Sequence, residues 1–535
     1  MTVEVKALKD INLKAVNVQQ LPDGFKNSVP QYEEFEVGHV LSRLLSTEAD
    51  SPTGRLKMAA CSMFMFDGAQ PRLAHERGEG RHGMSFAIDL KKGQTYRFAV
   101  VGSTMSSAQH PDAINEVKRL AIYCKMQGVE RLMVQHRSLW HGLWKSDIVI
   151  EGDKQSQQDV HNMMYHLYAF VREGSRLSIS PMGLSGLGYN GHVFWDADTW
   201  MFPALLLLHP ELARSMVDYR SDRLEAAKQY AFEHGYKGAM YVWESADSGF
   251  EDTPVFAMTG PFEHHVTGCV ALAAWQYYCV ARDAEWLRLS GYPILKETAD
   301  YWLSRVEKGR DGMYHINNVV AADEWAENVD NNAFTNGAAK VNLLCAARAA
   351  RELGLEPNQR WTEVADSIAF IKGEGGVTME YLGYKGQPIK QADVNLLAYP
   401  LKLATDRKSI GADLEYYRTK VPEKETPAMT QAIFALLYSR LGNERMAWHY
   451  FKDSYMPNRL PPFGVIAETK GGTNPYFATG AGGTLQAVIM GFGGIDISYE
   501  GRGISQMKSL LPKKWKKLTF TSIGKEHRCY TVSNP

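Results

Sequence analysis

Apolar residues between Gln155 and Phe492 recur every three to four positions, which is the period of an amphipathic helix. Nearly every segment of this stretch has that pattern, and Gly, Pro, Asn or Asp residues separate one segment from the next. The pattern predicts a succession of helices at Gln158–Val171, Glu211–Glu233, His264–Ala281, Ala284–Val306, Gly337–Gly354, Arg360–Lys372, Gln391–Ala404, Thr426–Leu441 and Glu444–Tyr455.

The two ends of the chain have a different pattern. Up to about residue 105, short alternating runs such as Arg55–Phe66 and Gly83–Val101 are broken by turn residues, which predicts β-strands. Helical periodicity then runs from Pro111 to about Ser146, and strand character returns after Gly494. We therefore expect an N-terminal β-sandwich portion (1–105), a helical linker (106–152), a helical domain (153–494) and a small C-terminal β-cap (495–535).

The loops between the predicted helices are unequal in length. The long ones, at 179–196, 236–261, 311–335 and 459–479, are the richest in Gly, Pro, Trp, Asp and Glu. Antiparallel helices need short connections on one side only, so long loops gather at the other side. The expected fold class is mainly α, a toroid of helical hairpins, with its functional residues on the long-loop face.

Charge and composition narrow the range of partners. The 535 residues carry 59 Lys and Arg against 60 Asp and Glu, a formal net charge of −1, which gives no electrostatic reason to expect nucleic acid or an anionic membrane. A hydrophobic share of 45% is that of a globular chain. The 12 Trp, 26 Tyr and 21 Phe suit a large core, which is their commoner use, or a surface that stacks on sugar rings.

The six cysteines contain no CxxC pair and no zinc-like Cys/His spacing, so we expect no disulfide framework and no metal site. The N-terminal residues MTVEVKALKDINLK lack the apolar region of a signal peptide, and Pro203 interrupts the longest apolar stretch. As written, the chain is expected to be soluble and cytoplasmic.

The loop AADEWAENVDNNAFTN, at 321–336, is a dense polar cluster that leads into a predicted helix. In this loop Glu324 adjoins Trp325, and an apolar ring beside a carboxyl group disfavours its charged form, which suits a general acid. The alternative is that the Asp and Asn residues form turns and helix caps.

A second acidic candidate is Glu468, the only acid in the stretch PPFGVIAETKGGTNPYFATGAGGTLQ at 461–486. In an inverting glycosidase a second carboxylate activates water on the opposite side of the substrate from the acid. The alternatives are a solvated loop, or an anion cradle in which the backbone N–H groups of Lys470, Gly471, Gly472 and Thr473 hold phosphate. A phosphorylase would hold phosphate with Lys470, Thr469 and Thr473.

Tryptophan and acidic residues are adjacent in two further loops, as Trp195 with Asp196 and as Trp243 with Glu244. Aromatic faces stack on sugar rings while carboxylates accept sugar hydroxyls, although a single buried Trp is usually plain core. Asp198 or Thr199 could cap the helix that follows. Four further residues are weaker candidates. Lys390 and Gln391 offer a cation and an amide, and the adjacent His264 and His265 have a spacing that does not suit metal ligation on one helix face.

Taken together and in this order, GHVFWDADTWMFP, RLEAAKQYAFEHGYKGAMYVWES, DEWAENVDNNAFTN and KQADV resemble glycoside hydrolase family 65 from about Trp140 to the C-terminus. The family comprises inverting enzymes that act on α-glucosides, mostly phosphorylases with some hydrolases. Its fold is a β-sandwich, a helical linker, an (α/α) toroid and a β-cap. The resemblance implies that Glu324 is the general acid and that glucose is bound by Trp195, Asp196, Trp243, Glu244, Trp325, Lys390 and Gln391.

The stretch around Glu468 departs from the family's phosphorylases, which have a Ser- and His-containing phosphate site there and no base. AET followed by FATGAGGTLQ is similar to the hydrolase branch, in which Glu468 would be the base. The resemblance therefore implies an inverting exo-α-glucosidase without a cofactor, acting on α-linked di- or oligosaccharides or glycans, such as α-1,2-linked kojibiose. A phosphorylase and a non-catalytic carbohydrate-binding toroid are the alternatives.

The first hundred residues are fewer than the large sandwich of that family would need. We therefore expect the N-terminus to be truncated or to begin at an internal Met, in which case the parent protein would be periplasmic or extracellular.

Overall fold

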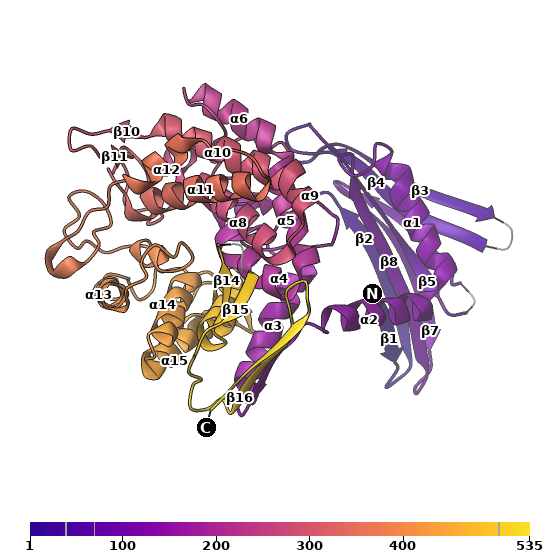
Figure 1. Ribbon diagram of the computed structural model, residues 1–535. Coiled ribbons are helices and arrows are strands. Elements are labelled where there is room, and N and C mark those ends of the chain that lie inside the picture. Colours follow the sequence, from indigo (N-terminus) through magenta and orange to yellow (C-terminus); the bar gives the residue numbers. More distant parts are fainter. Residues whose placement is uncertain (38–39, 69, 501–502, 535) are drawn as a thin grey trace. The chain divides into compact units, whose positions relative to one another are not determined.

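The computed structural model describes residues 1–37, 40–68, 70–500 and 503–534. The chain divides into two compact units, Met1–Gly142 and Leu143–Pro535 (Figure 1). The first unit is mostly β-structure, and the second contains most of the helices together with small strand pairs. Each unit is described by itself.

The first unit contains two antiparallel sheets. One has the strand order β1-β8-β5-β4-β3 and the other the order β2-β7-β6. The strands are β1 Thr2–Lys6, β2 Ile11–Gln20, β3 Lys26–Val37, β4 Val40–Asp50, β5 Lys57–Phe66, β6 Ala74–Gly78, β7 Arg81–Leu90 and β8 Thr95–Ser106.

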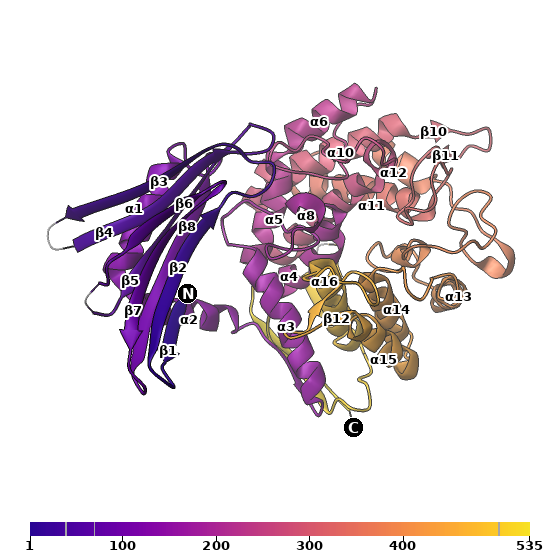
Figure 2. The same ribbon diagram turned by 180° about the vertical axis from the view of Figure 1, so that it is seen from behind.

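An aromatic core joins the two sheets of this unit. Phe64 of the larger sheet meets Phe86 of the smaller sheet with 5.1 Å between ring centroids, and Leu45, Met84 and Phe98 complete the cluster. The other face of the larger sheet packs on α1 (Ala113–Gln127), which buries Val117 and Ala121 against it (Figures 1 and 2). Gly128, with a φ of 79°, separates α1 from α2 (Val129–Leu143).

The second unit contains the helices α3 to α16. Their bounds are α3 Lys154–Phe170, α4 Phe202–Leu208, α5 Pro210–Asp222, α6 Leu224–Glu233, α7 Thr259–Phe262, α8 His265–Ala281, α9 Ala284–Trp286, α10 Tyr292–Arg305, α11 Ala333–Glu352, α12 Gln359–Asp366, α13 Arg407–Tyr417, α14 Ala428–Arg440, α15 Glu444–Asp453 and α16 Ala478–Gln486. Asp and Asn side chains cap several of them, as Asp153 does by accepting from the Ser156 amide at the start of α3.

Small strands accompany these helices. They are β9 Ile148–Glu151, β10 Glu307–Lys308, β11 Tyr314–His315, β12 Arg459–Leu460, β13 Val465–Ile466, β14 Ile495–Ser498, β15 Gly503–Gln506, β16 Lys517–Ile523 and β17 Arg528–Ser533. Near the C-terminus β14 pairs with β15, while β16 lies between β17 and β9 in a three-stranded sheet. The strand character predicted after residue 494 is confirmed by these four C-terminal strands.

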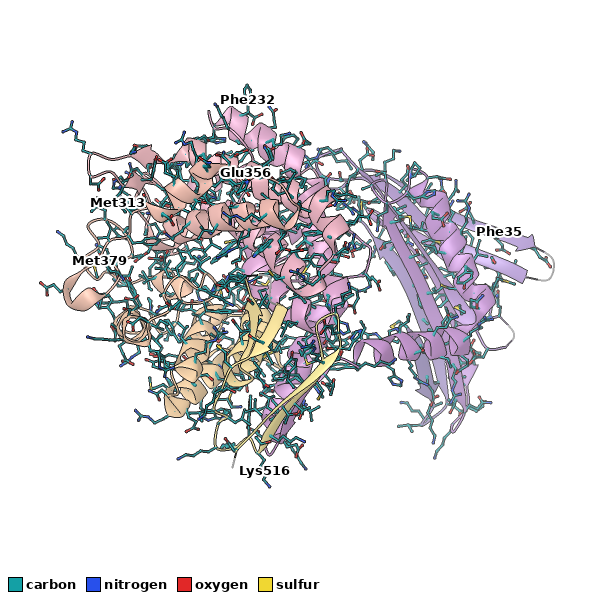
Figure 3. The ribbon with its side chains drawn as sticks, viewed as in Figure 1. Phe35, Phe232, Met313, Glu356, Met379 and Lys516 are labelled. Atoms are coloured by element: carbon teal, nitrogen blue, oxygen red, sulfur yellow. The ribbon has the colours of Figure 1, made fainter. Side chains whose placement is uncertain are left out.

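The helices of the second unit differ in how much of their surface is buried. Every residue of α8 is buried, whereas α12 buries only one face, with Trp361, Val364 and Ala365. Phe232 near the end of α6 lies at the surface of the unit (Figure 3). A helix that is buried all round has no polar face, whereas a helix at the surface has apolar residues on one face only. The periodicity of apolar residues therefore distinguishes interior helices from surface helices.

Glycines allow α16 to approach its neighbours closely. A Cβ atom at Gly482 would lie 2.5 Å from the carbonyl oxygen of Trp200. The run ATGAGGTLQ therefore belongs to a buried helix rather than to the loop that begins at residue 461.

The prediction of a helix at Gln391–Ala404 was wrong. The chain there forms only a short 3-10 turn, Val394–Leu397, and the next helix is α13. Pro400 has no amide hydrogen to donate and disfavours a helical conformation at the residue before it, so the apolar run NLLAYPL packs as a buried turn instead.

None of the helices in the described part of the chain combines the length and the apolar character that crossing a lipid bilayer requires.

Candidate active site

The predicted site residues lie in loops that lead into interior helices of the second unit. Asp196 immediately precedes a π-helical turn, Ala197–Met201, that continues into α4. Glu324 lies in the loop before α11, and Glu468 in the loop before α16.

Glu324 contacts Lys390 and Gln391, the cation and the amide that the sequence analysis named as weaker candidates. The Nζ of Lys390 donates to Oε1 of Glu324 at 2.8 Å, and the Nε2 of Gln391 donates to the same oxygen at 3.2 Å. Burial favours the neutral amine, but the Glu324 carboxylate outweighs it and raises the pKa of Lys390. The structure therefore brings Lys390 and Gln391 together at Glu324.

Asp323 anchors this loop from behind. Its Oδ1 accepts the backbone N–H of Lys390 at 2.6 Å and that of Trp325 at 3.4 Å, so it ties the acid loop to the Lys390 segment. Burial raises the pKa of Asp323 to about 6. Two buried carboxyl groups, Glu380 and Asp393, lie beside it. Burial raises the pKa of Asp393 to about 7 and raises the pKa of Glu380 well above its usual range.

The asparagines of the same loop are structural. The side chain of Asn332 accepts the Thr335 amide at 2.8 Å as the cap of α11 and donates to Asp393 at 2.8 Å. Asn331 is bonded to the ring of His315. Capping therefore explains Asn332, while the side chain of Glu324 is 24% exposed and faces Lys390.

Glu468 is held by two neutral donors. The hydroxyl of Tyr189 lies 2.8 Å from Oε1 and 2.9 Å from Oε2, and the amide of Asn474 donates to Oε2 at 3.0 Å. The backbone carbonyl of Glu468 accepts from the Ala428 amide at 2.9 Å, which fixes the loop to the start of α14. Neither Tyr189 nor Asn474 was predicted, because only the folded chain brings residues 189 and 468 together.

Asp196 is electrostatically close to both candidate carboxylates. Burial raises the pKa of Asp196 to about 7, and the charges of Glu468 and Glu324 contribute to that rise. Thr479 donates to its Oδ2 at 2.6 Å. Lys390 likewise interacts electrostatically with both Glu324 and Glu468. The two candidate carboxylates therefore share two ionisable neighbours, Lys390 and Asp196.

The loop with Trp243 and Glu244 is held by a carboxylate that sequence reasoning missed. The side chain of Glu251 accepts the backbone amides of Trp243 at 2.8 Å and Glu244 at 3.0 Å. The Oε2 of Glu244 bonds to Nδ1 of His192 at 2.8 Å, and that hydrogen bond raises the pKa of His192. The run VWESADSGFED, with acids at both ends of a turn, is the signal that could have revealed this arrangement.

The tryptophans of the site differ in exposure. Trp195 is 1% exposed, and its ring packs on Trp200, His265 and Phe334. Trp243 is 6% exposed, whereas Trp325 is 47% exposed. Trp325 is therefore the most accessible ring of the three for stacking on a sugar.

Asp198 and the two histidines have structural partners. Asp198 forms a buried ion pair with Arg220, with 2.6 Å between Oδ2 and Nη2. His265 bonds to Glu263 at 2.8 Å, and burial lowers the pKa of His265 to about 3, so its ring is neutral. His264 forms its hydrogen bond with Tyr301, so the two histidines have different hydrogen-bond partners.

In the alternative phosphate site, the cation Lys470 forms an ion pair with Asp453. The Nζ of Lys470 lies 2.8 Å from Oδ1 of Asp453 and 2.9 Å from Oδ2. An ammonium paired with a carboxylate in this way is less available to a phosphate anion.

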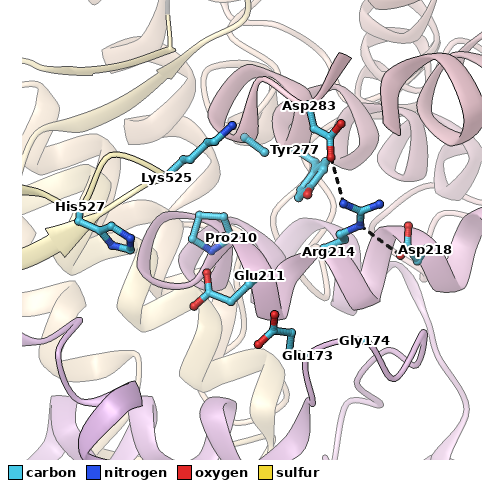
Figure 4. Close-up of a pocket in the computed structure, with 11 residues that line it drawn as sticks. Glu173, Gly174, Pro210, Glu211, Arg214, Asp218, Tyr277, Asp283, Lys525 and His527 are labelled. Atoms are coloured by element: carbon cyan, nitrogen blue, oxygen red, sulfur yellow. Dashed lines mark hydrogen bonds and ion pairs between the residues drawn. The ribbon is translucent and has the colours of Figure 1, made fainter. Parts of the chain in front are cut away.

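A separate cavity of about 380 Å³ lies in the second unit, lined by residues that include Pro210, Tyr277 and Lys525 (Figure 4). Its central cation, Arg214, is bonded to Asp283 at 3.0 Å and lies 3.5 Å from Asp218. None of the predicted site residues lines this cavity, so it is distinct from the candidate active site.

A carboxyl group beside a cation and a second carboxylate held by neutral donors provide the two unlike carboxyl groups of a glycoside hydrolase site. Comparison with known proteins agrees with that class. The profile of the glycosyl hydrolase family 65 central catalytic domain matches residues 161–385. The chain belongs to glycosyl hydrolase family 65, and it is a glycoside hydrolase with α-glucosidase relatives.

The relatives extend beyond that central domain. The kojibiose hydrolase of Mucilaginibacter mallensis is 55% identical over 536 residues, which cover 99% of this chain and 79% of the relative. The protein-glucosylgalactosylhydroxylysine glucosidase of Dictyostelium discoideum is 36% identical over 421 residues, 77% of this chain and 59% of that protein. A solved structure described as "Putative kojibiose phosphorylase from human microbiome" matches with a TM-score of 0.81 at 16% identity, covering 100% of this chain and 75% of that chain. It supports the fold alone.

Proposed function

We propose that this α-glucosidase is an inverting exo-enzyme that removes a terminal glucose from α-1,2-linked substrates such as kojibiose. The observation that supports the proposal most is a pair of carboxylates in unlike surroundings. Glu324 lies beside Lys390, and Glu468 lies beside Tyr189 and Asn474. Burial raises the pKa of Asp196, and the charges of both carboxylates raise it further. An inverting glycosidase requires two such carboxyl groups with separate roles.

In the proposed reaction, protonated Glu324 gives its proton to the glycosidic oxygen as the bond from that oxygen to C1 of glucose breaks. A water molecule attacks C1 from the opposite face of the ring, and Glu468 takes a proton from that water. The products are β-glucose and the shortened acceptor. Lys390 stabilises the Glu324 carboxylate that remains after proton transfer.

The family resemblance supplies the proposed contacts to glucose, which are Trp195, Asp196, Trp243, Glu244, Trp325, Lys390 and Gln391. Accessibility supports a division of labour among them. The half-exposed ring of Trp325 can stack on a sugar, whereas the buried Trp195 and Trp243 shape the floor of the site. The α-1,2 linkage is proposed from the kojibiose hydrolase relative, which is 55% identical across 99% of this chain.

Water is the proposed acceptor, rather than phosphate. A carboxylate at Glu468 repels a phosphate anion at short range, and the nearby Lys470 is already paired with Asp453. These two features oppose phosphorolysis.

We also propose that the helices of residues 153–494 close into the (α/α)6 toroid of the family, with a linker at 106–152 and a β-cap at 495–535. Site residues that precede three interior helices, α4, α11 and α16, support this arrangement because their loops then open on one face.

The test is to incubate the protein with kojibiose, nigerose, maltose and trehalose, with and without phosphate, and to quantify glucose and glucose 1-phosphate. The proposal expects glucose from kojibiose at a rate that phosphate does not change. Glu468→Gln should lose about 10²–10⁴-fold in rate, as expected for a lost general base. Phosphate-dependent glucose 1-phosphate, or near-wild-type hydrolysis by Glu468→Gln, would overturn it.

A further inference from the structure

Tyr189 is the residue closest to the proposed base that neither the sequence motifs nor the family resemblance assigns. Its hydroxyl contacts both carboxylate oxygens of Glu468, at 2.8 and 2.9 Å. The phenol also interacts electrostatically with Asp196 and Glu324. Tyr189 therefore contacts Glu468 directly and is influenced by the charges of Asp196 and Glu324.

The backbone at Tyr189 is held in an unusual conformation. Tyr189 and Asn190 have φ angles of 56° and 52°, in the left-handed region that non-glycine residues rarely adopt. The His192 amide donates to the carbonyl of Tyr189 at 2.8 Å, and the Tyr189 ring packs edge-on against Phe194 with 5.3 Å between centroids. Such conformations persist where the surroundings enforce them, and they are common at active sites.

The hydrogen bonds on the two oxygens of Glu468 are unequal. A carboxylate offers about four lone-pair positions in its plane, two on each oxygen. Oε2 accepts from Asn474 and shares the single phenolic hydrogen of Tyr189, whereas among the described residues Oε1 accepts only from Tyr189. The side chain of Glu468 therefore has its open acceptor position on Oε1.

We propose that Tyr189 is a positioning residue that orients the Glu468 carboxylate so that Oε1 takes the proton from the attacking water. This inference rests on the proposed role of Glu468 as base. Tyr189 acts by donating a hydrogen bond and does not itself accept the proton of the water. It thereby fixes which oxygen is the base and stabilises the charged form of Glu468 before each turnover.

The hydroxyl is suited to remain a donor. Burial, together with the charge of Glu468, raises the pKa of Tyr189, so the phenol keeps its hydrogen throughout the range in which the enzyme can work. A phenolate at this position would repel Glu468 instead of orienting it.

The central experiment compares Tyr189→Phe with wild type on kojibiose across pH. Loss of a hydrogen bond to a charged group should lower kcat about 10- to 100-fold. KM should change by less than about threefold, because the substituted ring still fills its place. The acid limb of the kcat/KM profile should move to higher pH, since a carboxylate with fewer donors holds its proton more tightly.

Tyr278→Phe is the matched control. Tyr278 donates to Glu352 at 2.8 Å, the same kind of contact at the same distance, but it lies at the far end of α8 from the site. It should change none of the three parameters. A Tyr189→Phe enzyme with unchanged kcat and an unmoved acid limb would overturn the inference.

A second arm uses Glu468→Ala with azide as the nucleophile. Azide attacks C1 without losing a proton, so the C–N bond forms and the C–O bond breaks with Glu324 still protonating the leaving oxygen, and no base is needed. In this background Tyr189→Phe should alter the azide-supported rate by less than about threefold, because no carboxylate remains to be oriented. A loss as large as that in the parent enzyme would assign Tyr189 another role and overturn the inference.

The Glu468→Ala experiment distinguishes failure of the proposed base from failure of the role inferred for Tyr189. If Glu468→Ala hydrolyses kojibiose at a near-wild-type rate without azide, the proposed base and this inference fail together. If Glu468→Ala is inactive and rescued by azide while Tyr189→Phe behaves as wild type, only the inference about Tyr189 fails.

Discussion

Replacing Asp196 with Asn should stabilise the free enzyme increasingly as the pH rises. Burial raises the pKa of Asp196 from 3.8 to about 7, a difference of about 3 units. At about 1.4 kcal/mol per unit, ionising this buried carboxyl group costs the native state up to about 4 kcal/mol. Asn has nearly the same shape and can still accept from Thr479, but it has no proton to lose.

The sign of the effect follows from proton binding. In the unfolded chain the carboxyl group loses its proton near pH 4, whereas in the native state it holds the proton until about pH 7. Between these values the native state binds more protons, so this group's contribution to wild-type stability is full below pH 4 and declines through that window. The stability of Asp196→Asn relative to wild type should therefore grow by roughly 2–3 kcal/mol between pH 5 and pH 8.

Denaturant unfolding followed by tryptophan fluorescence measures this difference. Eleven of the twelve tryptophans lie in Leu143–Pro535, so the signal reports the unit that contains Asp196. Asp366→Asn, at an exposed position in the last turn of α12, is the control and should give no pH-dependent difference. A difference between Asp196→Asn and wild type that stays constant from pH 5 to pH 8, or grows as the pH falls, would refute the reasoning.

Three further changes probe separate parts of the site. Glu324→Gln should lower kcat/KM on kojibiose about 10²–10⁴-fold but spare α-glucosyl fluoride, whose leaving group needs no proton; equal losses on both substrates would argue against an acid role. Arg220→Met should cost about 3–5 kcal/mol in the free energy of unfolding, because it leaves Asp198 buried without its partner, and an unchanged Tm would contradict this. Trp325→Ala should raise KM several-fold with little change in Tm, since the ring is half-exposed; the reverse pattern would make it a core residue.

The sequence predicted the helices of the second unit best where the apolar pattern was long and uninterrupted. The prediction His264–Ala281 agrees with α8 within one residue, and Thr426–Leu441 agrees with α14 within two. The prediction failed at Gln391–Ala404, where apolar residues are buried without a helix and Pro400 breaks the hydrogen-bond ladder. A short buried run has the same hydrophobicity in a turn as in a helix, so periodicity alone could not distinguish them.

The candidate site was predictable only in part, for a physical reason. Short polar motifs contain four of the predicted residues, Glu324, Trp325, Lys390 and Gln391. In the structure Lys390 and Gln391 donate hydrogen bonds to Glu324. Tyr189 carries no such local signal. It reaches Glu468 across 279 residues of sequence, and only the tertiary fold creates that contact.

The motif FWDADTW illustrates the same limit. Asp198 and Trp195 lie in the motif FWDADTW together with Asp196, yet Asp198 is paired with Arg220 and Trp195 is buried. Neighbours in sequence point in different directions at the start of a helix, so a motif identifies a site without assigning each of its residues a role.

The most direct test of the central claim is proton NMR of the glucose released from kojibiose in the first minutes of reaction, with and without phosphate. The account predicts an initial excess of the β-anomer over its equilibrium share, at the same rate in both samples. Initial release of α-glucose, or accumulation of glucose 1-phosphate when phosphate is present, would contradict inverting hydrolysis.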